Sequence, residues 1–480
     1  MLQLETMQNV EAEQLKQAFC KVMATEAKSV PPSPTLRQVS NIEIIIPHLL
    51  EVATTYQAWL EDDFIIWPFL GIGRFYNAQG FYAQAESWEE LCLNVVQTRL
   101  GHTHPDVAVS LNNLAENYRN QGRYSEAQSF YQRALSLWEI SLGKEHLDFA
   151  SCLNNLALVH QTLGRSAEAE TLHKKALSLR KRLLRKGHSD IVRSLNNLAS
   201  LYLSQSHYVE AKKTCEEALS LIQRTSGNDH PDLANTLNIL AELYRVQGNY
   251  KEATSLCQQS LKLAQQIFGE SHPSVATGLN NLADLYRLWE RYDEAEHLYQ
   301  KALSLRKQLL GDSHPDIATV LNNLGVLHEK QKRYEEAENV LKKALAIIEQ
   351  TMSCNHTYAA ATSNNLANIY NAQGRYEEAE QLYLKALHID LKELGEDHPD
   401  IALDLANLAS LYLTLKRFSE AEVCYLKACE IFTQRLGLNH PTTQTILRNF
   451  INFLDQVIAA EQISSLSNHG LTRYLLQQMI

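Results

Sequence analysis

The sequence predicts an all-α protein, a solenoid of stacked antiparallel helix pairs, and a strict internal period is the main observation behind this prediction. Histidine recurs every 42 residues, at positions 104, 146, 188, 230, 272, 314, 356, 398 and 440. Leucine follows the same interval from position 114 to position 408, and alanine follows it from position 127 to position 421. A period of this length is typical of repeat proteins, in which each unit buries its apolar face against its neighbours.

The period divides the chain into a repeat array and two flanking segments. Eight full units occupy residues 106–441, or 336 of the 480 residues. We expect residues 1–35 to form an N-terminal helix and a proline-rich linker, and residues 36–105 to form an N-terminal cap with one degenerate repeat. Residues 442–480 begin like another first helix and then lose the pattern, which predicts C-terminal capping helices.

The first helix of each unit is indicated by apolar residues at helical spacing. In the first unit, Leu111, Leu114 and Tyr118 fall at i, i+3 and i+7 and predict one buried face. Pro105 suits the first position of a helix, and Asp106 is favourable at the positive end of the helix dipole.

The second helix follows a short turn and carries small residues on its buried face. Ala127 and Ala134 permit close approach of the two helices, and Tyr131 is expected to fill the space between units. Gly122 is free to take the positive φ that ends the first helix. In four later units the turn glycine is replaced, and there we expect a somewhat different backbone geometry; the replacing residues are Ser206, Glu290, Lys332 and Lys416.

The degenerate repeat in residues 64–105 keeps the register of the later units but departs from them at two positions. Gly73, Tyr76 and Gly80 match the pattern. Glu89 stands where the other units often have tyrosine, and Cys92 stands where they mostly have alanine.

Composition and charge exclude several classes of protein. The chain is 45% hydrophobic and 21% charged, which is ordinary for a globular protein, and its formal net charge is -11. A negative chain is repelled by a phosphate backbone, so we expect no nucleic-acid partner. No stretch approaches the ~20 apolar residues of a membrane span, so we expect no membrane association. The eight cysteines form no Cys-x-x-Cys pair and are interpreted as reduced thiols of a cytoplasmic protein.

The repeat resembles known families. Residues 113–135, NLAENYRNQGRYSEAQSFYQRAL, resemble a tetratricopeptide repeat, whose usual unit is 34 residues. The longer unit, with LNNLA, Gly-Arg-Tyr-x-Glu-Ala-Glu and Leu-Gly-x-x-His-Pro-Asp, resembles the repeats of kinesin light chains, most clearly in residues 279–316 and 364–400. The resemblance implies a right-handed tetratricopeptide superhelix and a non-enzymatic scaffold that binds an extended peptide of a partner or cargo protein in its concave groove.

The same resemblance implies a cargo-adaptor subunit of a microtubule motor if it extends to function. Kinesin light chains join their heavy chain through an N-terminal heptad coiled coil, whereas residues 1–60 show no sustained heptads and include Val30-Pro31-Pro32-Ser33-Pro34. A motor heavy chain is therefore a doubtful partner. An alternative is a repeat sensor, because residues 46–104 resemble the segment that links an NB-ARC nucleotide switch to its repeats in bacterial signalling ATPases. The sequence has no Gly-x4-Gly-Lys-Ser/Thr loop, so the ATPase itself is absent.

Asparagine is the best candidate for ligand binding. It is a poor residue inside a helix, costing roughly 0.7 kcal/mol against alanine, so a long series needs a reason. The resemblance to kinesin light chains implies that these side chains hold the backbone of a peptide, since a carboxamide offers both a donor and an acceptor. The structural alternative is that they bond neighbouring helices or record recent duplication. The candidates are Asn112, Asn154, Asn196, Asn238, Asn280, Asn322 and Asn364 in one series, and Asn113, Asn155, Asn197, Asn281, Asn323, Asn365 and Asn407 in the other.

Three arginines on the same helix face are further peptide-binding candidates. Arg119, Arg245 and Arg287 could meet an acidic peptide, but each follows an acidic residue by three positions, and pairing within the helix is the simpler interpretation. Arg180 and Arg306, on second helices, are weaker candidates.

We expect no metal site, no cofactor and no catalytic residues. Histidines one helix pair apart are too far from one another to share a metal ion, so a role at helix starts is preferred for them. No nucleophile–base or carboxylate pair recurs outside the repeat pattern.

Overall fold

The computed structural model describes residues 2–30, 41–225, 232–351 and 356–479. These residues form helices joined by turns, with no strand among them. The expected proline-rich linker, His230 and Cys354 lie outside the described residues. The all-α fold class predicted from the 42-residue period is confirmed.

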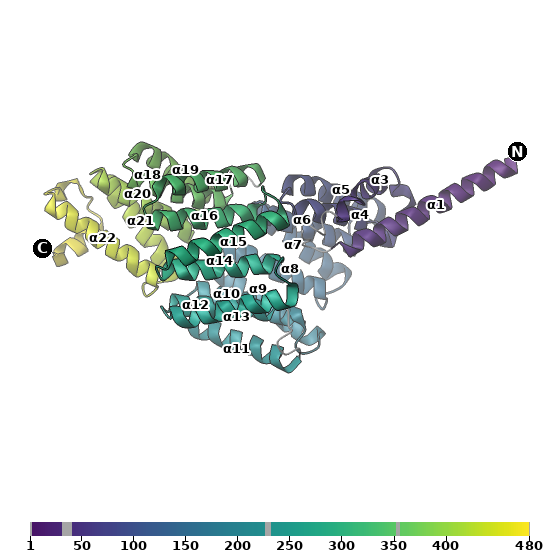
Figure 1. Cartoon of the computed structure of the whole chain (residues 1–480), viewed down its shortest axis with the longest axis horizontal. Helices are drawn as coiled ribbons and strands as arrows, with labels where there is room; N and C mark the ends of the chain where they lie inside the picture. The colour runs from purple at the N-terminus through teal and green to yellow at the C-terminus, as the bar shows by residue number, and fades with distance from the viewer. Residues whose placement is uncertain (1, 31–40, 226–231, 352–355, 480) are drawn as a thin grey trace.

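Eight consecutive helix pairs form the body of the molecule (Figure 1). Within each pair the two helices pack antiparallel, and each pair stacks on the next. The bounds are α6 (Pro105–Asn120), α7 (Tyr124–Ser141), α8 (Leu147–Thr162), α9 (Ser166–Leu183), α10 (Ser189–Ser204), α11 (Tyr208–Thr225), α12 (Leu233–Val246), α13 (Tyr250–Phe268), α14 (Pro273–Leu288), α15 (Tyr292–Leu310), α16 (Pro315–Lys330), α17 (Tyr334–Thr351), α18 (Thr357–Ala372), α19 (Tyr376–Leu394), α20 (Pro399–Thr414) and α21 (Phe418–Leu436).

The periodic histidines start the first helices. At each described position the histidine is the N-cap, and its Nδ1 accepts a hydrogen bond from the backbone N–H two residues on, as between His314 and Asp316 at 3.1 Å. The same bond occurs at His104, His146, His188, His272, His356, His398 and His440. One of the unpaired N–H groups of the first turn is thereby satisfied, so the capping role expected for this series is observed.

The turns between the paired helices share one backbone hydrogen-bond pattern, and the expected difference at the non-glycine turns is limited to a smaller positive φ. Gly122 has φ +80°, and Ser206, Glu290, Lys332 and Lys416 also have positive φ, between 58° and 60°. Their backbone hydrogen bonds match as well: Arg123 N–H donates to the Tyr118 carbonyl at 2.8 Å, and His207 N–H donates to the Tyr202 carbonyl at 2.8 Å. Tertiary packing imposes the left-handed conformation on these four residues, although their Cβ atoms make it sterically unfavourable.

Small and large side chains alternate in the core of each pair. Ala127, Ala134 and Tyr131 are completely buried, and Tyr299 and Tyr383 occupy the position of Tyr131 in later units. The alanines allow close helix contact and the tyrosine rings fill the space between units, as the sequence predicted. The apolar core is therefore a series of clusters along the solenoid, the two largest at its ends.

Helices outside the array cover its two ends. The N-terminal segment contains α1 (Leu2–Ser29), α3 (Ile46–Thr54), α4 (Trp67–Asn77) and α5 (Tyr82–Leu100), with 3-10 turns at Gln57–Trp59 and Asp62–Phe64. The pair α4–α5 continues the stacking, and α1 runs out from it toward the N-terminus (Figure 1). The C-terminal segment contains α22 (Pro441–Ala459), a 3-10 turn at Ile463–Ser465 and α23 (Gly470–Met479).

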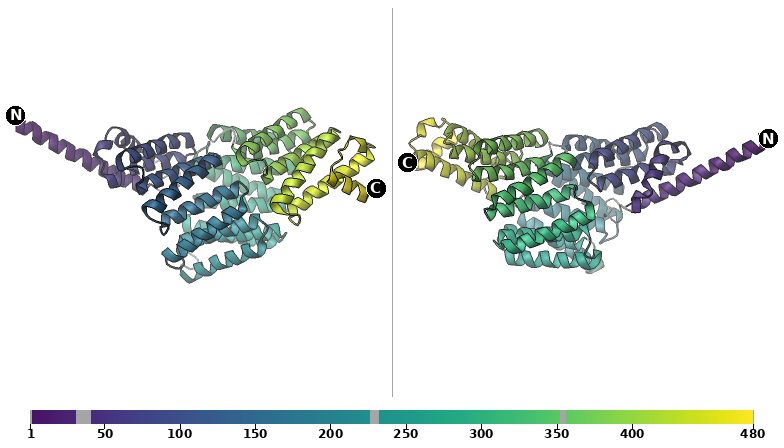
Figure 2. Two further views of the ribbon diagram at one scale, coloured as in Figure 1. Left: turned by 180° about the vertical axis from the view of Figure 1, so that it is seen from behind. Right: turned by 45° about the horizontal axis from the view of Figure 1, so that its top comes forward.

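The superhelix winds tightly enough for one turn to touch the next, a contact region that we call the seam (Figure 2). The turns after α4, α6 and α8 meet the starts of α16, α18 and α20, each six units further along the chain. A Cβ built on Gly80 would lie 2.6 Å from Pro315, and one built on Gly122 would lie 2.8 Å from His356. Tyr124 Oη is 3.4 Å from Thr357 Oγ1 across the seam.

The seam also changes the environment of its histidines. His356 is 3% exposed and its ring bonds the backbone of Asn120, whereas the side chain of His146, away from the seam, is 41% exposed. Burial lowers the pKa of His356 to about 4. This contact makes the molecule more compact than a solenoid in which each unit touches only its neighbours.

Among the helices of the described segments, none combines the length and the apolar character that crossing a bilayer requires.

Candidate peptide-binding groove

The two asparagine series meet between consecutive first helices. Asn197 Nδ2 donates to Asn154 Oδ1 at 3.0 Å, so that an amide of one unit bonds an amide of the unit before it. The same bond joins Asn323 to Asn280 at 3.1 Å and Asn365 to Asn322 at 3.0 Å. We call these three the closed amide pairs. Their hydrogen bonds are those expected from the structural alternative.

Other members of the first series bond different neighbours. Asn196 Oδ1 accepts from Thr236 Oγ1 at 2.9 Å, because Ile239 replaces its amide partner. Asn154 Oδ1 also contacts His173 Nδ1 at 3.0 Å. Asn364 Nδ2 donates to Asp404 Oδ1 at 2.5 Å. These side chains hold adjacent helices in register.

Three amide pairs lack the bond between units, and we call them the open amide pairs. They are Asn112 with Asn155, Asn238 with Asn281, and Asn364 with Asn407. Within the described part of the chain, the buried Oδ1 atoms of Asn112, Asn238 and Asn364 have no hydrogen-bond partner. A buried carbonyl without a donor is unfavourable by about 1–3 kcal/mol, so these positions carry unused hydrogen-bonding capacity.

The candidate arginines pair with acidic residues of their own helices. Arg287 Nη2 lies 3.4 Å from Asp284 Oδ1, and Arg119 Nη2 lies 3.6 Å from Glu116 Oε1. Arg245 forms a two-point contact with Glu242, with Nε 2.5 Å from Oε2. The pairing within the helix that the sequence indicated is therefore present at all three positions.

The weaker candidates are structural. Arg180 is buried, and its guanidinium donates to Ser194 Oγ at 2.7 Å and to Ser151 Oγ at 3.0 Å. Arg306 is also buried and donates to the Asp316 carbonyl at 2.6 Å. Each guanidinium holds the next first helix in place.

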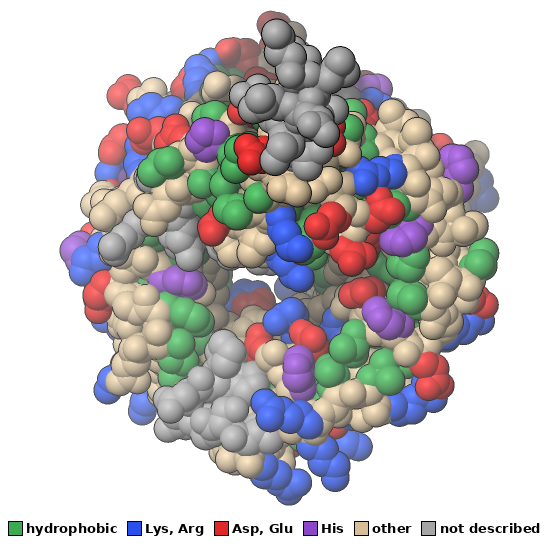
Figure 3. Space-filling view, turned by 90° about the vertical axis from the view of Figure 1, so that its right-hand side faces the viewer, with side chains coloured by type: hydrophobic (Ala, Val, Ile, Leu, Met, Phe, Trp, Pro, Cys, Tyr) green, Lys and Arg blue, Asp and Glu red, His purple; other side chains and the backbone are tan. Residues whose placement is uncertain are grey.

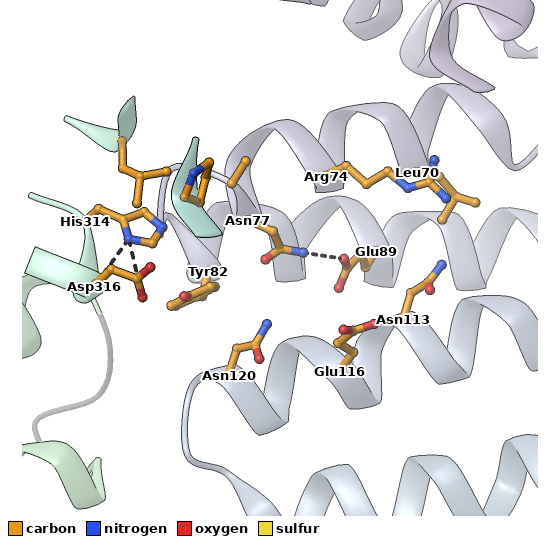
Figure 4. Close-up of a pocket in the computed structure, with 13 residues that line it drawn as sticks. Leu70, Arg74, Asn77, Tyr82, Glu89, Asn113, Glu116, Asn120, His314 and Asp316 are labelled. Atoms are coloured by element: carbon orange, nitrogen blue, oxygen red, sulfur yellow. Dashed lines mark hydrogen bonds and ion pairs between the residues drawn. The ribbon is translucent and has the colours of Figure 1, made fainter. Parts of the chain in front are cut away.

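Two cavities border first helices that carry candidate residues. One is lined by α12 and α14 and includes the open pair Asn238 and Asn281 together with Arg245 and Arg287. The other lies between the N-terminal cap and the seam and includes Asn113, Glu116 and Asn120 (Figure 4). Viewed along the long axis, the molecule is hollowed at its centre, with charged side chains at the margin (Figure 3). The candidate residues of the first helices therefore contribute to a recessed surface.

A second polar network, which sequence reasoning missed, ties the turns together. Arg123, in the turn after α6, contacts Glu86 of the preceding unit at 2.7 Å and Glu126 of its own unit at 2.5 Å. Its guanidinium also lies 4.1 Å from the ring centroid of Tyr118. Arg333, Arg375 and Arg417 repeat the arrangement. The signal was the recurring Arg-Tyr/Phe-x-Glu-Ala-Glu motif, which was interpreted only as a mark of the repeat.

The potential metal ligands and the thiols of the described residues are dispersed or buried. In the described ranges no three His, Cys, Asp or Glu residues converge as metal ligands. The seven described cysteines are free and buried. Burial raises the pKa of the Cys257 and Cys429 thiols to about 12, which keeps them protonated and unreactive.

Sequence reasoning assigned no ligand-binding role to Glu89, Arg74, His314 and Asp316, which share the cavity beside the seam (Figure 4). Glu89 was recognised only as a departure from tyrosine. The cavity joins elements far apart in the sequence, so the pattern of a single unit contains no signal for it.

Comparisons with solved structures agree with this architecture. A Rap protein complexed with competence and sporulation factor is 15% identical and covers 74% of this chain and 99% of its own, with a TM-score of 0.50. BtubC (BKLC) from P. vanneervenii is 26% identical over 49% of this chain and 92% of its own, with a TM-score of 0.38. A putative kinesin light chain of nearly identical TPR-like repeats from Podosopora anserina is 24% identical over 43% of this chain and 97% of its own, with a TM-score of 0.34.

The family comparison is more direct. A search of curated proteins gives no match. The family model described as tetratricopeptide repeat matches residues 65–140, 111–182, 190–253, 232–308, 290–350 and 358–434. These ranges cover most of the chain and include the degenerate repeat of the N-terminal cap. The chain therefore belongs to the tetratricopeptide-repeat family, and kinesin-light-chain-like repeat proteins are among the structures it is similar to.

Proposed function

We propose that the protein is a non-enzymatic scaffold that binds an extended peptide segment of a partner protein along its first helices. The open amide pair of Asn238 and Asn281 carries this proposal, because both side chains line a cavity and the buried Oδ1 of Asn238 has no donor. A peptide backbone supplies alternating N–H and C=O groups, which complement carboxamides whatever the peptide side chains are.

The distribution of closed and open pairs further supports the proposal. The closed pairs use their amides to hold neighbouring units, so they explain only part of the asparagine series. The open pairs Asn112–Asn155 and Asn238–Asn281 retain the unfavourable mid-helix residue without that benefit, whereas Asn364 keeps a bond to Asp404 of the next unit. The Rap protein with a similar fold is complexed with competence and sporulation factor, which is a precedent for a ligand on this architecture.

A cargo-adaptor role in a motor and a sensor role beside a nucleotide switch would both use this groove. The contacts of α1 do not support attachment to a partner through a free coiled coil. Cys20, Ala24 and Ala27 of this helix are completely buried against the cap. That part of α1 is committed to the solenoid. We therefore propose peptide capture as the shared activity.

The test compares an open pair with a closed pair. The full chain is immobilised and presented with a random peptide library, and bound peptides are quantified by mass spectrometry. The double variant Asn238→Ala and Asn281→Ala should lose at least about tenfold in capture with little change in melting temperature. The matched control, Asn322→Ala and Asn365→Ala, breaks a closed pair at 3.0 Å and should lower the melting temperature while keeping more of the capture.

Two outcomes would overturn the proposal. A wild-type protein that selects no peptide from the library would exclude peptide capture as its function. Equal capture by the open-pair variant and the wild type would exclude the amides as its determinants.

A further inference from the structure

The N-terminal cap contains an acidic residue at a position where other units place a core tyrosine. Tyr131, Tyr299 and Tyr383 are completely buried at the equivalent positions, and Glu89 is 5% exposed. Glu89 Oε1 accepts from Asn77 Nδ2 at 3.1 Å, but the buried Oε2 has no partner. The carboxyl is shorter than a tyrosine and leaves both space and an unsatisfied oxygen where a ring would otherwise pack.

The space beside Glu89 is a cavity of about 540 Å³ between the cap and the next turn of the superhelix (Figure 4). On the cap side it is lined by Arg74 and Asn77, and on the side of α6 by Asn113 and Glu116. Leu310, His314 and Asp316 close it from across the seam. Both turns of the superhelix therefore contribute to the wall of this cavity.

The side chains of α6 that line this cavity, Asn113 and Glu116, also have unused hydrogen-bonding capacity. In the other units the second-series asparagine faces an amide one unit earlier, but the partner position of Asn113 is occupied by Leu70. The Glu116 side chain is 49% exposed, and its distance of 3.6 Å from Arg119 is longer than a hydrogen bond. Glu89, Asn113 and Glu116 thus offer three oxygen acceptors from two neighbouring helices.

We propose that this cavity binds a positively charged group of the captured peptide, either its amino terminus or a lysine side chain. A primary ammonium has three N–H donors and no acceptor, which matches the three oxygens. A carboxylate would have to approach Glu116 and Asp316, and the one guanidinium of the lining, Arg74, interacts electrostatically with Glu116 and donates to the Val30 carbonyl at 2.8 Å. The inference rests on the proposed function and adds the class of residue that the peptide must carry.

The protonation of Glu89 gives this site a pH dependence. Burial raises the pKa of Glu89 well above its ordinary value, which favours the neutral form of the carboxyl in the empty cavity. An adjacent ammonium favours ionisation, so binding releases a proton and the affinity increases with pH. The charged and titratable groups around Glu89 are Arg74 on α4, Glu86 and Cys92 on α5, Glu116 on α6, Tyr131 on α7, and His314 and Asp316 across the seam.

The experiment uses the full chain and defined pools of random octapeptides. Four pools carry one lysine or one norleucine at a scanned position, each with a free or an acetylated amino terminus. The wild type should enrich peptides with the preferred positive group at least about tenfold over the matched neutral pool. The lysine arm identifies a side-chain source, and the free-terminus arm identifies a main-chain source.

The diagnostic variant is Glu89→Gln, which is isosteric with the protonated carboxyl and is therefore expected to fold. It should reduce the charge preference below about twofold and abolish the increase in affinity between pH 6 and pH 8. The matched control is Glu90→Gln, the next residue along α5, whose side chain is exposed. Glu116→Gln provides a second variant of the same site.

The outcomes separate this inference from the proposed function. Specific capture of neutral peptides without charge preference, or an unchanged preference in Glu89→Gln, would overturn the cation site and leave the scaffold proposal intact. Capture of no peptide at all would overturn both.

Discussion

Replacing Gly122 by alanine should weaken the seam between successive turns of the superhelix, and Gly374 provides a matched control. Both residues end a first helix with similar positive φ, +80° and +76°. Alanine in that conformation costs roughly 1 kcal/mol at either position. A Cβ on Gly122, however, would lie 2.8 Å from His356 Cδ2 and 3.3 Å from its Nε2, whereas nothing lies within 4 Å of a Cβ on Gly374.

The magnitude follows from what His356 must give up. Its ring is 3% exposed and bonds the backbone of Asn120, so it cannot move aside without losing buried contacts and that hydrogen bond. Overpacking of a buried site costs about 1–3 kcal/mol, and a lost hydrogen bond adds about 1 kcal/mol. Gly122→Ala should therefore destabilise the protein by roughly 2–4 kcal/mol more than Gly374→Ala does.

Two measurements check this prediction. Thermal unfolding should place the midpoint of Gly122→Ala below that of Gly374→Ala. Small-angle X-ray scattering should show a larger radius of gyration for the double variant Gly122→Ala and Gly164→Ala than for Gly248→Ala and Gly374→Ala, because only the first pair faces the seam. Equal midpoints together with equal radii would refute the seam as a contact that holds the solenoid closed.

Three further predictions concern stability. Asp390 and Asp404 are buried side by side, which raises their pKa values to about 8 and about 7. The folded state therefore binds more protons than the unfolded state, and the protein loses stability as pH rises from about 4 to 8. Asp390→Asn should flatten this decline, and parallel melting profiles for the variant and the wild type between pH 5 and pH 8.5 would contradict the assignment. Glu290→Gly should stabilise the protein by roughly 1 kcal/mol in denaturant unfolding, because it relieves a φ of 58°, and a decrease in the unfolding midpoint would show that the turn is not strained. Ala253→Trp should lower the melting temperature through overpacking by about 1–3 kcal/mol, since Ala253 is completely buried, and an unchanged melting temperature would place this residue outside the core.

The helix pairs were predictable because their signals lie within a single unit. Leu111, Leu114 and Tyr118 define a buried stripe by helical spacing alone, and all three are buried. His314 precedes a proline at a helix start, where a side chain that accepts a hydrogen bond caps the helix. At the non-glycine turns the predicted difference is small, because the stacking of the paired helices determines the geometry even where intrinsic preference disfavours positive φ, as at Ser206 and Glu290.

The candidate site was predictable only in part. Helical geometry placed Asn238 and Asn281 on the face that borders a cavity, but it gave no indication of which amides bond each other. Which amides bond each other depends on the distance between consecutive first helices and on single departures from the asparagine series, such as Ile239. The cavity beside Glu89 was not predictable, because four of its thirteen lining residues come from a distant part of the chain, positions 273 to 316.

The seam was hidden for a related reason. Gly122 and Gly374 end their helices in the same way, yet only the first contacts another turn. The pitch of a superhelix is the sum of small rotations over six units, and no single unit contains it.

Contact between distant units also alters how such an array should unfold. An open solenoid behaves as a row of nearest-neighbour interactions, so it can fray from either end one unit at a time. Here Gly122 packs on His356 and Gly164 packs on His398, so the unfolding of early units is coupled to the unfolding of late units. When the molecule is pulled from its two ends, the contacts of the seam should break first, in one force peak. The units should unfold one after another only after the seam has opened.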